Sequence, residues 1–139
     1  MKRFTSIIIV ICLVISCLSF SAGAVDERNA GNNSRYTGLI TMGSSLDISS
    51  IGRAYADVVV SLRDGYKATM HVALNQEGLS SEDVVKEWNV SIPDGGDTWA
   101  GVYYVASGYF YWTTVTLDVY TTGGRFVETV VLDSNEVYY

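Results

Sequence analysis

Few residues in this sequence could do acid, base or nucleophilic chemistry. His71 is the single histidine, and a Ser-His-Asp triad would have to use it. No serine lies in a nucleophile-elbow pattern, and no Ser-x-x-Lys spacing occurs that could supply a serine-lysine dyad. Because His71 alternates with Thr69 and Lys67 on the polar side of an apolar-polar run, we expect an exposed strand histidine and no catalytic residue.

Acidic residues offer two further kinds of site. Two carboxylates about 5 to 9 Å apart can hydrolyse a glycosidic bond, so a secreted, glycan-directed hydrolase is the alternative function. The segments Asp94–Asp97 and Asp133–Glu136 could supply oxygen ligands to Ca²⁺, but neither has the alternating ligands of a strong calcium loop. Asp and Asn also stabilise turns through local hydrogen bonds. We therefore expect turns at both segments, no metal site and no cofactor.

Aromatic residues give the strongest functional signal. Rings stand on both sides of a strand expected over residues 109–120. A strand of a two-sheet fold has one buried side, so rings on its other side would face water, where they can stack on sugar rings or anchor a protein partner. The alternative is that neighbours of a central strand cover both sides. The rings proposed for binding, on the outward side of residues 99–120, are Tyr103, Tyr109, Tyr111, Trp112 and Tyr120.

The first 24 residues have the order of a secretory signal peptide. A basic pair precedes the apolar run Phe4–Phe20, and small residues ending at Ala24 follow, so cleavage is expected after Ala24. Two alternatives would keep the chain at the membrane: the run could be retained as an anchor, or Cys17 could be lipidated, because the segment that ends there resembles a bacterial lipobox. We expect a secreted, extracellular protein with no stable membrane span in its mature chain.

Length and charge restrict the mature chain further. Cleavage would leave about 115 of the 139 residues, enough for one domain. The whole chain has a net charge of −6, and without Lys2 and Arg3 seven basic groups face fifteen acidic ones, a net −8. That balance excludes a nucleic-acid surface. Since both cysteines, Cys12 and Cys17, belong to the leader, the domain must be stabilised by its core. We expect a signal peptide at 1–24, a flexible linker at 25–35 and one domain at 36–139.

Period-two alternation of apolar and polar residues predicts an all-β fold. The clearest signal is a hairpin of Arg53–Arg63 and Tyr66–Asn75, joined by Asp64 and Gly65 in a type I′ turn. Before it, two short apolar pieces at 36–42 and 46–48 predict an edge strand that kinks or changes sheet at the intervening Gly-Ser-Ser.

The second half continues the pattern. Ser80–Asp83 matches a capping box and the apolar residues up to Trp88 fit a helical face, so a short helical turn and a short strand are both open. Further strands are expected at 99–105, 109–120, 126–132 and 137–139. About seven short strands separated by turns predict a single antiparallel β-sandwich.

The turn glycines and aromatic residues resemble those of a group of small secreted proteins of Gram-positive bacteria. That group, a domain of unknown function, consists of a signal peptide and one immunoglobulin-like β-sandwich. The sequence departs from its pattern at Trp112, where a basic residue is expected, and at Asn75. The likeness covers nearly the whole mature chain and implies a fold and a compartment but no catalytic residue. The segments that carry it are Ser45–Ser49, Gly52–Ala54, Leu74–Gln76, Ser107–Trp112, Val119–Tyr120, Gly123–Gly124, Val127–Thr129 and Ser134–Tyr138.

The sequence therefore predicts a noncatalytic binding or cell-envelope interaction module with an aromatic surface. Its partner would be an envelope glycan or a protein. Because the net charge is negative, anionic wall polymers would be repelled unless divalent cations bridge them.

Overall fold

The computed structural model describes residues 28–30, 35–78 and 82–139 of the chain. The expected leader, its alternatives at Cys17 and most of the expected linker lie outside these residues. Residues 28–30, which belong to the expected linker, form a short strand.

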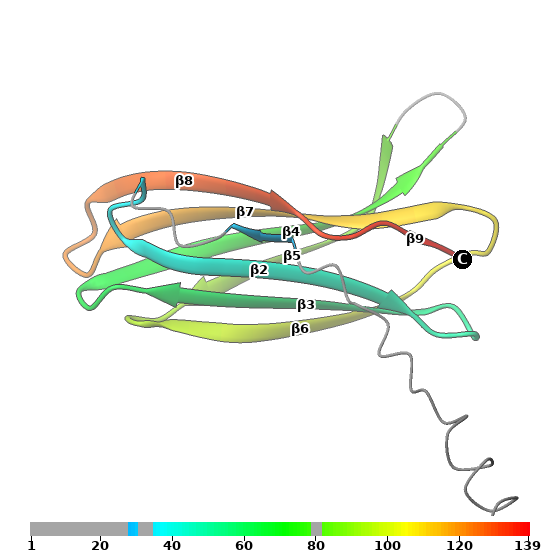
Figure 1. Cartoon of the computed structure of the whole chain (residues 1–139), viewed down its shortest axis with the longest axis horizontal. Coiled ribbons are helices and arrows are strands. Elements are labelled where there is room, and N and C mark those ends of the chain that lie inside the picture. Colours follow the sequence, from blue (N-terminus) through cyan, green and yellow to red (C-terminus); the bar gives the residue numbers. More distant parts are fainter. Residues whose placement is uncertain (1–27, 31–34, 79–81) are drawn as a thin grey trace, which may run out of the picture.

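The described residues form nine strands and two antiparallel sheets, stacked in a β-sandwich-like arrangement (Figure 1). Sheet A has the strand order β1-β2-β3-β6, and sheet B has the order β5-β4-β7-β8, with β9 beside one end of β7. No helix that could cross a membrane occurs in this part of the chain. The strands are β1 (Arg28–Ala30), β2 (Leu39–Ile48), β3 (Arg53–Leu62), β4 (Tyr66–Glu77), β5 (Glu82–Ile92), β6 (Gly96–Tyr104), β7 (Phe110–Thr121), β8 (Phe126–Asp133) and β9 (Val137–Tyr138).

The core lies between the sheets and follows the alternation that the sequence predicts. On β3 every second residue from Ala54 to Leu62 is buried, and on β4 every second residue from Ala68 to Leu74 is buried. β7 buries Tyr111, Thr113, Val115, Leu117 and Val119 in the same way. Because successive side chains of a strand point to opposite faces, this pattern leaves the other half of each strand outside.

The predicted hairpin of β3 and β4 is wrong, although both strands exist. β3 pairs with β2 and β6, whereas β4 pairs with β5 and β7, so the chain crosses from one sheet to the other at residues 63–65. Both strands have an apolar face, and each buries it against the opposite sheet. Gly65 has a φ of +85°, but no residue other than glycine has a positive φ in the described chain, so Asp64 does not adopt the type I′ geometry. The turn is closed by its own bond from Tyr66 N to Arg63 O at 3.2 Å. It is also held from outside, since Gly65 N donates to Asp94 Oδ1 and Arg63 N donates to Gly38 O.

The structure also tests the sequence predictions for residues 36–48 and for the segment before Trp88. β2 is one continuous strand rather than two pieces broken at 43–45, because Ser44 faces inward and its hydroxyl lies 3.0 Å from that of Thr113 on β7. This polar pair lets a small hydroxyl sit in the apolar interior with a partner. The ambiguous segment before Trp88 is the strand β5 from Glu82 on, while Ser80 and Ser81 lie outside the described residues.

One long side of the sandwich is joined by side chains that bond to backbone. The Glu128 carboxylate of β8 accepts hydrogen bonds from the backbone N–H groups of Thr37, Gly38 and Leu39 at 2.9, 2.9 and 3.1 Å. Further along, the Asn135 amide accepts from Leu46 N at 3.0 Å and donates to Leu46 O at 2.9 Å, as a neighbouring strand would. β2 is thereby tied to sheet B, and part of its outer edge is covered.

The other long side is joined by two tryptophans. Trp88 on β5 and Trp99 on β6 meet edge to face with ring centroids 5.3 Å apart, and both pack against the core. Gly101 makes room for them, since a Cβ there would lie 2.3 Å from the Trp99 ring. The two indoles therefore fill the space between the edge strands of the two sheets.

Replacing Glu128 by Gln should lower the free energy of unfolding by about 1 to 3 kcal/mol, because the amide has one acceptor oxygen in place of two. Its NH2 group cannot accept the bond from Thr37 N when its oxygen bonds to Gly38 N and Leu39 N, and those two bonds lose the charge of the carboxylate. Urea unfolding at neutral pH measures the change. Glu136→Gln is the matched control, since Glu136 is exposed. Equal stability of the two variants would contradict this role for Glu128.

Candidate functional site

The structure separates the five rings that the sequence proposes for binding. Tyr103 lies on β6 in sheet A, and Tyr109 lies in the connection that precedes β7; their exposed fractions are 38% and 39%. Trp112 and Tyr120 are both half-buried on the outer face of β7, but eight residues of strand, about 27 Å, separate them. They do not form one site.

Tyr111 requires a correction, because its ring does not face outward. It is fully buried in the core, and its hydroxyl donates to Ala106 O at 2.7 Å and lies 3.1 Å from Gln76 Oε1. Burial raises the pKa of this hydroxyl and the neighbouring Tyr109 adds to that, while the bond to Ala106 acts in the opposite direction. Tyr111 therefore anchors the β6–β7 connection and is not available to a ligand.

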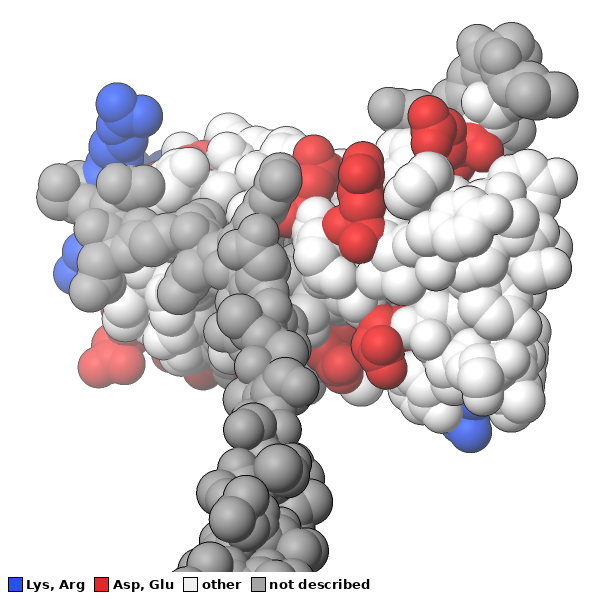
Figure 2. Space-filling view, turned by 45° about the vertical axis from the view of Figure 1, so that its right-hand side comes forward, with Lys and Arg blue, Asp and Glu red and all other residues white. Residues whose placement is uncertain are grey.

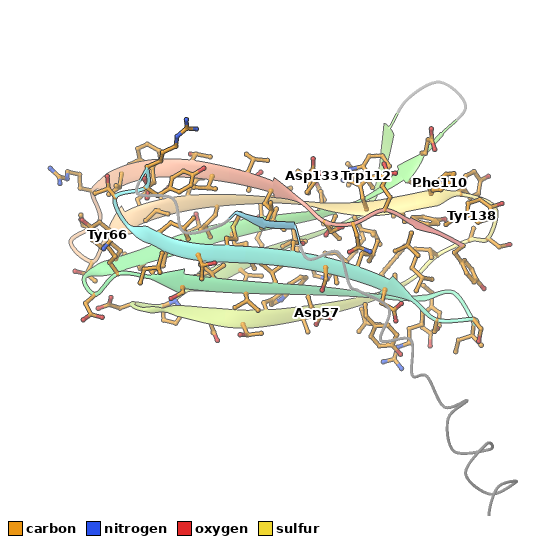
Figure 3. All side chains as sticks on the ribbon, viewed as in Figure 1. Asp57, Tyr66, Phe110, Trp112, Asp133 and Tyr138 are labelled. Atoms are coloured by element: carbon orange, nitrogen blue, oxygen red, sulfur yellow. The ribbon has the colours of Figure 1, made fainter. Side chains whose placement is uncertain are left out.

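The burial of Tyr111 places its two neighbours on the outer face of sheet B. Phe110 is 43% exposed there, and its strand partner Tyr138 on β9 is 64% exposed. Their ring centroids are 5.0 Å apart with an angle of 57° between the planes. Trp112 follows two residues after Phe110 on the same face, about 7 Å further along the strand. We call Phe110, Trp112 and Tyr138 the aromatic strip; Figure 3 shows the three side chains near one end of sheet B.

A chain of polar groups continues the aromatic strip along the same face. Asn75 is the strand partner of Trp112, and its Nδ2 donates to Thr114 Oγ1 at 3.0 Å. Thr114 in turn donates to Asp133 Oδ1 at 2.7 Å. Asn75 is buried whereas Asp133 is exposed. The row of hydrogen-bonded side chains therefore runs from the interior to an exposed carboxylate beside Trp112 (Figure 3). The rings can stack against a flat apolar surface of a ligand, and the carboxylate beside them can accept hydrogen bonds from that ligand.

The end of the molecule that carries the strip has few charges. In Figure 2, where the right-hand side of Figure 1 is turned forward, a broad area without charged side chains covers this end, and acidic side chains stand beside it. At the same end, the hairpin of β4 and β5 projects above sheet B (Figure 1). Backbone bonds between Tyr109 and Tyr139, 3.0 and 3.2 Å long, fix the C-terminal strand there.

His71 lies further along the outer face, as expected for a strand histidine. Its Nε2 is 3.3 Å from Glu87 Oε1, and both side chains are exposed, at 41% and 57%. A shallow depression of about 310 Å³ adjoins it, lined by residues of β4, β5 and β7 that include Thr69, Asn89 and Asp118. Asp118 is bonded by the Thr129 hydroxyl.

Acidic residues of the two segments expected to form turns have bonding partners, but only the partner of Asp97 is a neighbour in sequence, and Asp133 is the last residue of β8. Asp94 accepts from Gly65 N, and Asp97 accepts from Thr98 N, both at 2.8 Å. Asp133 is bonded by Thr114. Within residues 28–30, 35–78 and 82–139, no three His, Cys, Asp or Glu side chains gather in a way that could hold a metal ion.

Sequence reasoning did not select two rings of the strip. Phe110 shares its side of the strand with Trp112, so the alternation that selected Trp112 could have selected it too. Tyr138 could not be found this way, because its position depends on the pairing of β9 with β7, which no local pattern gives. Conversely, Tyr120 lies at the other end, where its ring centroid is 5.7 Å from that of Phe126.

Comparison with known proteins gives little similarity. No protein-family model matches the chain, and no curated protein matches it in sequence. Among solved structures, a GH3 β-glucosidase of Bifidobacterium adolescentis is similar with a TM-score of 0.32 and 11% sequence identity. The match covers 68% of this chain and 17% of the enzyme.

Tyr111→Phe should lower the free energy of unfolding by about 1 kcal/mol at pH 7, because Ala106 O loses its hydrogen bond. The raised pKa means that the folded protein favours the neutral hydroxyl, so this contribution is present below the unfolded pKa of about 10 and is lost as the pH rises through the folded-state pKa. Urea unfolding at pH 7, 9, 10 and 11 should show the difference between wild type and variant shrinking above pH 10. Tyr138→Phe is the control, since Tyr138 is exposed. A difference that stayed constant from pH 7 to 11 would contradict the assignment.

Proposed function

We propose that this chain is a secreted, noncatalytic module of immunoglobulin-like type that binds a cell-envelope ligand through its aromatic strip. The observation that carries the proposal is one strip of three rings, the exposed Phe110 and Tyr138 and the half-buried Trp112, beside hydrogen-bonding groups. Contiguous apolar surface of this kind on a protein in water is typical of a binding site.

Two features support the immunoglobulin-like type. Antiparallel sheets with the orders β2-β3-β6 and β5-β4-β7-β8 have the crossed connections of a Greek-key sandwich, since β3 and β4 follow each other in sequence but belong to different sheets. Tyr111 stands near the start of β7, and its hydroxyl bonds to Ala106, five residues upstream. That bond corresponds to the tyrosine corner of immunoglobulin-like domains.

The signal-like order of the first 24 residues supports secretion. In the described residues the two sheets are joined by buried apolar residues and side-chain hydrogen bonds rather than by cysteines, so the fold of this part does not depend on the redox state of its surroundings. We propose a Gram-positive envelope as its place of action, on the basis of the resemblance of its turn and aromatic segments.

A neutral glycan is the ligand that the strip suits best. The C–H faces of sugar rings stack on aromatic rings, and sugar hydroxyl groups donate to carboxylates such as that of Asp133. Anionic polymers suit the strip less well, because acidic side chains stand beside it (Figure 2). A protein partner remains the other kind of ligand that exposed rings can anchor.

Trp112→Ala should reduce binding about tenfold, a loss of about 1.4 kcal/mol, because one stacking surface is removed. The measurement is co-sedimentation of the domain with purified Gram-positive cell walls and with insoluble neutral polysaccharides such as cellulose and chitin. Phe126→Ala is the matched control, since Phe126 is an exposed ring at the other end of sheet B.

Equal retention of the two variants would contradict a role for the strip, and no retention of wild type on any of these polymers would contradict glycan binding. Release of reducing sugars from the same polymers would instead favour a hydrolase, and Asp133→Asn would then test the carboxylate nearest the strip.

A further inference from the structure

The outer edge of β6 has unpaired backbone groups. Two hydrogen bonds at the ends of its ladder with β3, Leu62 N to Gly95 O and Val105 N to Gly52 O, show that its odd-numbered residues bond to β3. Antiparallel residues alternate between the two sides of a strand. The even-numbered residues therefore direct their N–H and C=O groups to the open edge.

Three successive even-numbered residues of β6 have unpaired backbone groups on the open edge. Thr98 N donates to the carboxylate of Asp97, which closes the edge at that point. In the part of the chain that the structure describes, Ala100, Val102 and Tyr104 have no such partner on the open side. Their side chains lie on the outer face of sheet A, with Val102 42% and Tyr104 62% exposed.

β6 lacks the features that keep edge strands apart. Edge strands of soluble proteins are usually protected by Lys, by Pro or by inward-pointing charges. β6 contains no Lys, Arg or Pro, and its one charged residue, Asp97, lies at its N-terminal end. The edge strand of sheet B on the same side, β5, carries Lys86 and Glu87.

We propose that β6 pairs with β6 of a second copy of this chain, antiparallel and about a two-fold axis at Val102. This register pairs all three residues: Val102 lies opposite Val102 of the second copy, and Ala100 lies opposite Tyr104 of the second copy. It leaves Asp97 and Thr98 outside the paired segment. Sheet A then continues across the two copies as one eight-stranded sheet.

Side-chain sizes favour a second copy as the partner strand. In this register Tyr104 lies opposite Ala100 on the outer face, so the large ring meets a small residue. On the inner face Tyr103 lies opposite Gly101, whose own space is filled by the indoles of Trp88 and Trp99. No charged side chain lies opposite another. The interface is also independent of the aromatic strip, which belongs to sheet B, so it holds whether or not the strip binds a glycan.

The test is the oligomeric state at rising protein concentration, measured by sedimentation velocity at physiological salt. Wild type should show a monomer–dimer equilibrium. Val102→Lys and Val102→Glu should each sediment as monomers, because the substituted charge faces its own copy across the axis. An equimolar mixture of the two variants should restore the dimer, since Lys then faces Glu. Val59→Lys is the matched control: Val59 is 49% exposed on the same outer face but belongs to the inner strand β3, and this variant should dimerise like wild type.

Circular dichroism spectra of the variants, compared with that of wild type, serve as the control for folding. A wild type that remains monomeric at millimolar concentration would overturn the proposal. Dimers that persist in Val102→Lys, or a mixture that stays monomeric while both variants are folded, would show that the axis does not lie at Val102 and would overturn it equally.

Discussion

Burial of Tyr111 is the interaction that determines how the residues around the aromatic strip are arranged. Its ring packs in the core with Leu46 and Leu74, and its hydroxyl holds the connection from β6. Because a strand alternates strictly, a fixed Tyr111 sends Phe110 and Trp112 to the outer face. A shift of one residue would exchange the buried and exposed sets along all of β7. The core therefore determines which rings meet water.

Buried side chains and a few polar bonds also hold the rest of the two sheets together. With no cysteine in the described residues, the sheets are joined by apolar side chains and by a few polar bonds between sheets, of which Glu128, Asn135 and the Ser44–Thr113 pair are examples. The first two also cover the edge of β2, whereas β6 has no comparable cover. Binding on the face of sheet B and pairing at the edge of sheet A are thus separate surfaces of one scaffold.

Local patterns predicted the strands but not their partners. The alternation in 53–62 and 66–74 identified most of the buried residues, because burial of one face is a local property, but it missed Ala73, which is buried on the other side of β4. It could not show that the two strands join different sheets, since the Asp64–Gly65 signal fits a sheet-to-sheet turn as well as a hairpin. The same limit explains the site: Trp112 was found from its strand, Tyr111 was assigned outward because either face could have been the core side, and Tyr138 needed a pairing that only the tertiary structure supplies.

The most direct test of this account is an NMR titration of the domain with soluble fragments of the polysaccharide that retains it. The account predicts that the indole N–H of Trp112 and the amides of Phe110 and Asn75 shift with added ligand, while the indoles of Trp88 and Trp99 between the sheets stay unchanged. Shifts confined to the opposite end, around Tyr120 and Phe126, or to β6 would contradict it.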